Sequence, residues 1–79
     1  METVFINSEY ITLGQFLKFK GLISNGSDAK IAVLERKITV NGVPENRRGR
    51  KIYPDDVVKI EKSVFLVKSK HENQENRAV

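Results

Sequence analysis

The spacing of apolar residues changes once along this chain, and that change limits the folds open to it. Before residue 38, apolar residues recur three and four positions apart, as Leu13, Phe16 and Leu17 do, which is the period of a helix face. From residue 38 onward they tend to alternate with polar residues, which is the period of a strand. Helices grouped before strands indicate an α+β domain, with two short helices packed on a small, mostly antiparallel sheet. Because the chain has 79 residues, we expect one such domain.

The first helix is expected over residues 13–20. Thr12 and Gln15 have the spacing of a capping box, in which each side chain bonds the backbone N–H of the other residue. Gly21 is a plausible stop, because glycine readily adopts the left-handed backbone that ends many helices. The sequence therefore bounds this helix at both ends.

The second helix is expected after a break at residues 25–27, with Ser27 or Asp28 as its N-terminal cap. Its small apolar residues make one stripe, which comprises Ala29, Ala32 and Val33. Ile31 and Leu34 lie off that stripe, so the helix is apolar on more than one side. We therefore expect a second contact there, for example with an outer strand.

Five short strands are expected around these helices. Residues 3–6 are β-branched and aromatic and indicate an edge strand. Asn41-Gly42, flanked by apolar residues, is a strong hairpin signal and begins the strand-rich half. Strands over residues 57–61 and 64–68 follow a turn that begins at Pro54.

The limits of the domain follow from composition. We expect one folded domain over residues 1–68 and a disordered polar tail over residues 69–79, which has no apolar period. No apolar run approaches the ~20 residues of a membrane-spanning helix. The first residues lack a basic region followed by a long apolar run, so no secretory signal is expected. We expect a cytoplasmic protein.

Several kinds of chemistry have no support in the residues. The chain has no cysteine and one histidine, His71, so neither a thiolate site nor a zinc site is expected. Asp55 and Asp56 are adjacent carboxylates, but they lie in a turn that Pro54 initiates, and turn formation explains them without catalysis. The glycines do not form a phosphate-binding loop pattern. We therefore expect no enzyme, no metal and no cofactor.

Positive charge is concentrated in the middle of the chain. The formal net charge is +4, but the stretch from Lys18 to Lys51 holds nine basic and three acidic residues, a balance of +6. Its densest part is a segment at residues 46–51, the basic loop, whose cations are Arg47, Arg48, Arg50 and Lys51. Such a patch suggests a polyanionic partner, with nucleic acid first and a membrane surface second. The plain alternative is a solvated loop that only keeps the protein soluble.

Two segments taken together resemble a known family. They are SNGSDAKIAVLERKITVNG, residues 24–42, and RRGRKIYPDDVVKI, residues 47–60. They resemble the RNA-binding domain first described in small-subunit ribosomal protein four, also called the alpha-L motif. The resemblance runs from about Ile11 to Ile60, and the short stand-alone form is similar to a bacterial subgroup of small single-domain proteins. The positions that carry it, in order, are Ala29, Val33, residues 38–42 and residues 54–57.

The resemblance implies that RNA lies in a groove between the two helices and the basic loop. Carried over by position, the implied contacts are Lys30 on the second helix, Lys37 just after it, Asn41 in the hairpin turn, and Arg47, Arg48, Arg50 and Lys51 in the basic loop. Further candidates are Gln15 and Lys18 on the first helix, and Arg36. The implied partner is structured RNA, with ribosomal RNA first and a role in ribosome assembly or function, and we expect a monomer. Lys30 and Lys37 are two helical turns apart, so we expect them to share one side.

Three departures from the family pattern bear on that footprint. Many members begin the first helix with Arg-Leu-Asp, where this chain has residues 12–14, Thr-Leu-Gly. Many have Ser-Arg before the second helix, where this chain has Asn25-Gly26. Arg36 stands where a helix-ending glycine is common. If its backbone is left-handed, it costs roughly 1 kcal/mol relative to glycine, which contacts of the side chain with phosphate would offset.

The same residues are also compatible with different roles. Asn41 is most simply a turn former, and Tyr53 and Phe19, which have the chemistry to stack on bases, are more simply packing residues. A DNA-associated factor would use the same positive patch. A protein-interaction module is the third class, because a small sheet with the segment YPDDVV also resembles ubiquitin-like sulfur carriers. The chain ends in Asn-Arg-Ala-Val in place of their Gly-Gly, so we expect no carrier chemistry.

Overall fold

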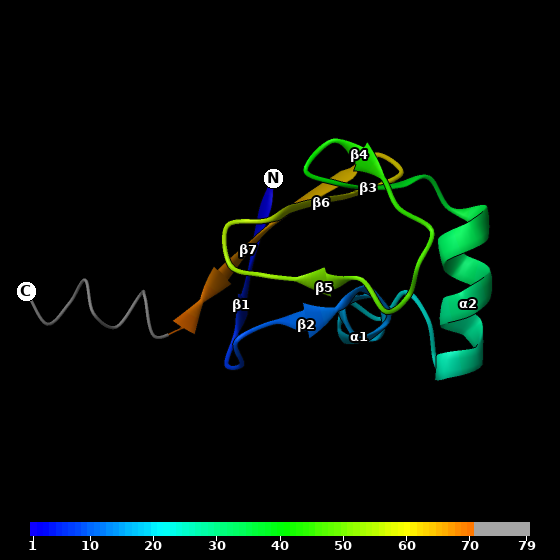
Figure 1. Cartoon of the computed structure of the whole chain (residues 1–79), viewed down its shortest axis with the longest axis horizontal. Coiled ribbons are helices and arrows are strands. Elements are labelled where there is room, and N and C mark those ends of the chain that lie inside the picture. Colours follow the sequence, from blue (N-terminus) through cyan, green and yellow to red (C-terminus); the bar gives the residue numbers. More distant parts are fainter. Residues whose placement is uncertain (71–79) are drawn as a thin grey trace, which may run out of the picture.

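The computed structural model describes residues 1–70, which form two helices and two sheets (Figure 1). In chain order the elements are β1 (Glu2–Ile6), β2 (Ile11–Thr12), α1 (Leu13–Phe19), α2 (Gly26–Glu35), β3 (Ile38–Val40), β4 (Val43–Pro44), β5 (Lys51–Ile52), β6 (Val57–Ile60) and β7 (Ser63–Ser69). The predicted tail falls almost wholly on residues 71–79, which lie outside the described residues.

The larger sheet has the strand order β1-β7-β6-β3-β4. Its pairs are antiparallel except for β1 and β7, which run parallel. The predicted α+β fold with a mostly antiparallel sheet is confirmed, and β1 lies at the edge of the sheet as expected. The sheet thereby brings the two ends of the folded chain side by side.

A second, two-stranded sheet was not predicted. It pairs β2 with β5, with Ile11 opposite Ile52 and Thr12 opposite Lys51. Strands of two residues are too short to show an alternating pattern, so periodicity could not reveal them. In Figure 1 this sheet lies beside α1, and the loop between β4 and β5 runs back toward it from the side of α2.

Both predicted boundary signals of α1 are confirmed. Thr12 Oγ1 accepts from the backbone N–H of Gln15 at 3.2 Å, and Gln15 Oε1 accepts from the backbone N–H of Thr12 at 3.0 Å. Gly21 has φ +72°, and the N–H groups of Gly21 and Leu22 donate to the carbonyls of Lys18 and Leu17. This double bond pattern is a Schellman motif, and it ends the helix one residue before the predicted limit.

The predicted cap of α2 was wrong. Asn25, and not Ser27 or Asp28, is the N-cap: it has an extended backbone, and its side-chain Oδ1 accepts from the N–H of Asp28 at 3.1 Å. Asparagine caps a helix as well as serine or aspartate does, so three successive candidates had the same propensity. The left-handed backbone considered for Arg36 is absent too. Arg36 has φ −86° and ψ 147°, so no backbone strain is stored there.

The core lies between the helices and the larger sheet. Its innermost side chains from α1 are Leu13, Phe16 and Leu17, which are fully buried. Phe16 packs edge-on against Phe65 of β7, with ring centroids 5.4 Å apart. The other buried apolar residues come from both helices and from β1, β3, β5, β6 and β7. Thus α1 joins the two sheets to one core.

Two turns place the hairpin and the strand that follows the basic loop. Asn41 and Gly42 both have positive φ, 53° and 83°, as the predicted hairpin requires. In the second turn the N–H of Asp56 donates to the carbonyl of Tyr53 at 3.0 Å, and Asp55 has φ +78°. The Asp56 carboxylate accepts from the N–H of Tyr53 at 2.8 Å and from the Asn41 amide at 3.0 Å. These bonds give Asp56 a structural role.

The expected second contact of α2 was also wrong. Among the described residues, no element covers Ile31 or Leu34, whose exposed fractions are 54% and 65%. Phe19, expected to be a packing residue, is exposed as well. The stripe of small residues does face inward, because Ala29, Ala32 and Val33 are buried. The helix is therefore packed on one side and carries an apolar crest on the other.

Candidate nucleic-acid interface

The basic loop is held against the first turn of α1. The backbone N–H groups of Leu13 and Gly14 donate to the carbonyls of Arg50 and Arg48, each at 2.8 Å. The first N–H groups of a helix have no partner within it, so the loop satisfies donors that would otherwise need water. A Cβ at Gly14 would lie 3.4 Å from the Arg48 carbonyl oxygen and 3.5 Å from the Ala29 Cβ. Glycine thus permits the close approach of the loop, α1 and α2.

A buried carboxylate organises the same loop from below. Glu45 is the one buried charged residue among residues 1–70. Arg47 donates to it from Nε at 2.9 Å, from Nη2 at 3.2 Å and from its backbone N–H at 3.1 Å. Arg50 donates from Nη1 at 3.0 Å. These bonds close the loop into a compact turn, in which the N–H of Arg50 donates to the Arg47 carbonyl at 3.2 Å.

The electrostatics of this cluster follow from its bonds. The side-chain hydrogen bond from Arg47 is the largest influence on Glu45, and with the Arg50 bond it lowers the pKa of Glu45 from 4.5 to about 2, against the opposing effect of burial. The same bond raises the pKa of Arg47. Both groups are therefore charged at neutral pH. Arg47 bonds with one edge of its guanidinium, and its side chain stays 71% exposed.

Two adjoining grooves lie between this loop and the helices. The first, of about 380 Å³, runs between α1 and the loop and includes Gln15, Lys18 and Arg48 in its lining. The second, of about 350 Å³, runs between α2 and the loop and includes Lys30, Arg47 and Arg48. Arg48 and Gly49 line both, so we treat them as one surface. We call it the basic groove, and its polar members are Gln15, Lys18, Lys30, Arg47 and Arg48.

The other predicted contact residues lie away from the basic groove. Arg36 and Lys37 line a third groove, which shares Val33 and Asn46 with the second. The helical spacing assumed for Lys30 and Lys37 does not apply, because α2 ends at Glu35 and Arg36 is extended. Arg36 also pairs with Glu61 at 3.0 Å.

Arg50, Lys51 and Asn41 have other surroundings. Arg50 is half-buried against Glu45. Lys51 projects from β5, with its Nζ 4.9 Å from the ring centroid of Tyr10. The Asn41 amide bonds Asp56 and accepts from the Val57 N–H at 2.8 Å, so it holds the hairpin against β6.

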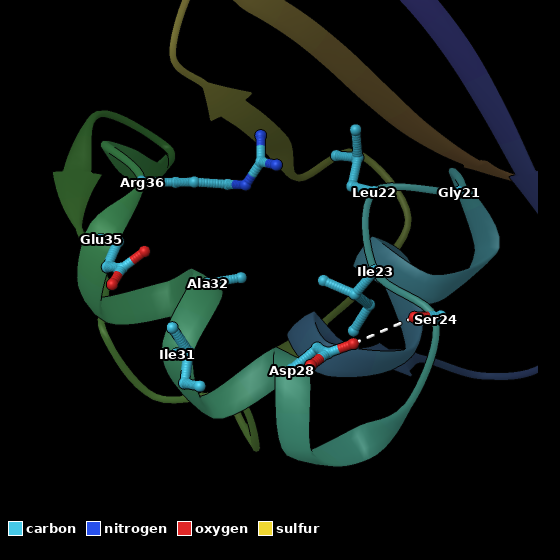
Figure 2. Close-up of a pocket in the computed structure, with 9 residues that line it drawn as sticks. All are labelled: Gly21, Leu22, Ile23, Ser24, Asp28, Ile31, Ala32, Glu35 and Arg36. Atoms are coloured by element: carbon cyan, nitrogen blue, oxygen red, sulfur yellow. Dashed lines mark hydrogen bonds between the residues drawn. The ribbon is translucent and has the colours of Figure 1, made fainter.

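The opposite side of α2 bounds a different pocket, of about 400 Å³. Figure 2 shows Asp28 at one end of it, bonded to Ser24, and Glu35 and Arg36 at the other. Ile31 and Ala32 line the wall between them. Since Arg36 is paired with Glu61, the cation of this pocket is matched by an acid, and Asp28 and Glu35 make it acidic.

Glu45 was missed as a functional residue by reasoning from the sequence. Among nine cations in the middle stretch, one of three acids does not stand out. The usable signal was its position two residues before Arg47 and five before Arg50, at the start of a loop too dense in like charge to be compact without a counter-ion.

Two further features of residues 1–70 concern excluded chemistry. No helix in this part of the chain is long and apolar enough to cross a membrane. No three acidic or histidine side chains in it gather closely enough to hold a metal ion.

Comparison with known proteins identifies the family. The family model described as "S4 domain" matches residues 4–68, which is most of the chain. One relative is the "Probable ribosome maturation protein RlbA" of Bacillus subtilis (strain 168), with 54% identity over 56 residues that cover 71% of this chain and 79% of the relative. The resemblance noted in the sequence is thereby confirmed, and the chain belongs to the S4 domain family.

Proposed function

We propose that this protein is a non-catalytic RNA-binding protein that acts on the ribosome in the cytoplasm and grips structured ribosomal RNA with the basic groove. The observation that carries the proposal is the convergence of Gln15, Lys18, Lys30, Arg47 and Arg48, from three separate segments, on adjoining grooves. The printed name of the Bacillus subtilis relative, a ribosome maturation protein, supports ribosomal RNA as the ligand.

The mechanism in this proposal is mainly electrostatic. Arginine presents a planar fork that binds two phosphate oxygens at once, whereas lysine acts as a point charge. The ion pairs with Glu45 fix the loop before RNA arrives, so less conformational entropy is lost on binding. A rigid positive groove of this kind reads the shape of a folded RNA more than its sequence.

Arg36, Lys37, Asn41, Arg50 and Lys51 remain predicted contacts of a second rank. Arg50 and Asn41 already have structural bonds, so their contribution to RNA binding would come partly through the loop and the hairpin that they hold. Arg36 and Lys37 would be reached only by an RNA that extends past Asn46 into the third groove.

The proposal is tested by the salt dependence of binding. For about four to six phosphate contacts, the logarithm of the affinity for a labelled ribosomal RNA fragment should fall against the logarithm of the salt concentration with a slope of about −3 to −5. Fluorescence anisotropy at several salt concentrations measures it. A slope near zero contradicts the proposal, and so does complete displacement of the RNA by an equal amount of duplex DNA.

The bound RNA is identified by crosslinking in cells followed by sequencing. Enrichment of ribosomal RNA is the expected result. Association with proteins that survives nuclease treatment, without crosslinked RNA, would instead favour a protein-interaction module.

A further inference from the structure

The two tyrosines of the chain form an exposed pair at the end of the small sheet. Tyr10 immediately precedes β2 and Tyr53 immediately follows β5, next to the paired residues Ile11 and Ile52. Their ring centroids are 5.6 Å apart at an angle of 46°. Their exposed fractions are 37% and 41%, so both rings keep much of their surface in water.

A cation adjoins this pair on the same face. Side chains alternate along a strand, so Lys51 and Tyr53 lie on one face of β5 while Ile52, between them, is fully buried on the other. Lys51 Nζ is 4.9 Å from the Tyr10 ring centroid, which is a cation–π contact. Tyr10, Lys51 and Tyr53 thus make one aromatic and cationic surface, which we call the tyrosine patch.

The tyrosine patch adjoins the basic groove through Thr12. Thr12 is the register partner of Lys51 in the small sheet, and it also lines the part of the basic groove between α1 and the loop. In Figure 1 β2 leads directly into α1, while β5 leads away from the basic loop. A strand of nucleic acid that leaves the groove past Thr12 therefore meets Lys51 next, and then the two rings.

We propose that the tyrosine patch binds an unpaired RNA base that adjoins the helix held in the basic groove. The inference rests on the proposed function and adds to it the kind of RNA that is preferred, namely a junction between a helix and a single strand. Exposed aromatic rings stack on bases of any sequence, and an adjacent cation holds the phosphate that follows. Bases within a duplex are already stacked on one another, so an uninterrupted helix offers the patch nothing to bind.

The chain itself supplies the reporter for the test. It has no tryptophan and only these two tyrosines, so its intrinsic fluorescence under tyrosine excitation comes from the patch alone. The probes are RNA hairpins with one common stem, either blunt or with a short run of unpaired adenines at the 5′ or the 3′ end. Anisotropy of the labelled RNA reports total binding, and tyrosine fluorescence reports stacking.

The expected result is that a hairpin with an unpaired extension quenches the tyrosine fluorescence and binds about tenfold more tightly than the blunt one, as expected for one stacked base. Tyr53→Ala should remove that preference and leave the affinity for the blunt hairpin unchanged, whereas Tyr53→Phe should retain it. Phe19→Ala, at an exposed aromatic outside the patch, is the matched control and should retain it too.

Two outcomes overturn the inference and differ from failure of the proposed function. If all hairpins bind equally and none quenches the fluorescence, the patch takes no base although the groove binds RNA. If Tyr53→Ala weakens binding of the blunt and extended hairpins alike, the pair only supports the fold. If no hairpin binds, the proposed function fails first and the inference fails with it.

Discussion

The two sides of α2 differ in charge although they belong to one short helix. On one side Lys30 lines the basic groove with Arg47 and Arg48, and on the other Asp28 and Glu35 make a pocket acidic. The apolar crest, with Ile31, lies along the outward side of the helix. A polyanion is attracted to one side and repelled by the other, so α2 orients RNA on the protein and does not merely pack against the sheet.

The largest effect is expected from removing charge on the groove side. Lys18→Ala, Lys30→Ala and Arg48→Ala combined should weaken RNA binding roughly a hundredfold, at about one charge-assisted contact each. The salt slope should become shallower by about 2 to 3. Anisotropy with the blunt hairpin measures both, and thermal unfolding checks that the variant is folded.

The acidic side of α2 supplies the matched control for that variant. Asp28→Asn with Glu35→Gln changes charge on the same helix without touching the groove, and it should leave RNA affinity equal or slightly higher. An equal loss in both variants would mean that the two sides do not differ in function.

The next effect concerns how the groove is held. Glu45→Gln removes a negative charge beneath the loop, so simple electrostatics predicts tighter RNA binding. We expect the reverse, a loss of several-fold, because Arg47 and Arg50 lose the partner that orders them. Stability should fall by about 1–3 kcal/mol, since a charged hydrogen-bonding group is lost from a buried site. Urea unfolding and anisotropy measure the two effects, and a gain in affinity at unchanged stability would contradict the role given to Glu45.

The same ion pairs make part of the stability depend on pH. The pKa of Glu45 is about 2 in the folded protein and its ordinary value is 4.5, so the folded state favours the charged carboxylate. This contribution is therefore fully present above pH ~4.5 and is lost as the pH falls toward about 2. The difference in unfolding free energy between the native chain and Glu45→Gln should be constant near neutral pH and shrink over that range. A difference that stays constant down to pH ~2.5 would show that the carboxylate is not held by these pairs.

Much of the fold could be predicted from the sequence because its signals are local. The capping box of Thr12 and Gln15 and the Asn41-Gly42 turn each act within four residues, and both formed as expected. The N-cap of α2 was wrong because Asn25, Ser27 and Asp28 have equal propensity, and only the tertiary position of the helix start decides among them.

The candidate site was predictable in its residue types but not in its geometry. Which cations share a groove depends on the loop's docking on the N–H groups of Leu13 and Gly14, a contact between segments far apart in the chain. The role of Glu45 depends on that docking as well. Spacing alone wrongly suggested that Lys30 and Lys37 share one helix side.

The smallest effect is expected on the crest of α2. Ile31 is more than half exposed, so Ile31→Ser removes little buried apolar area and should change the unfolding free energy by no more than about 0.5 kcal/mol. RNA affinity should not change, because Ile31 lines the acidic pocket and not the basic groove. Val33→Ser, two residues away and buried, is the contrasting variant and should destabilise strongly. If Ile31→Ser proves as destabilising as Val33→Ser, the crest is covered in solution, and the comparison between the two sides of α2 must include whatever covers it.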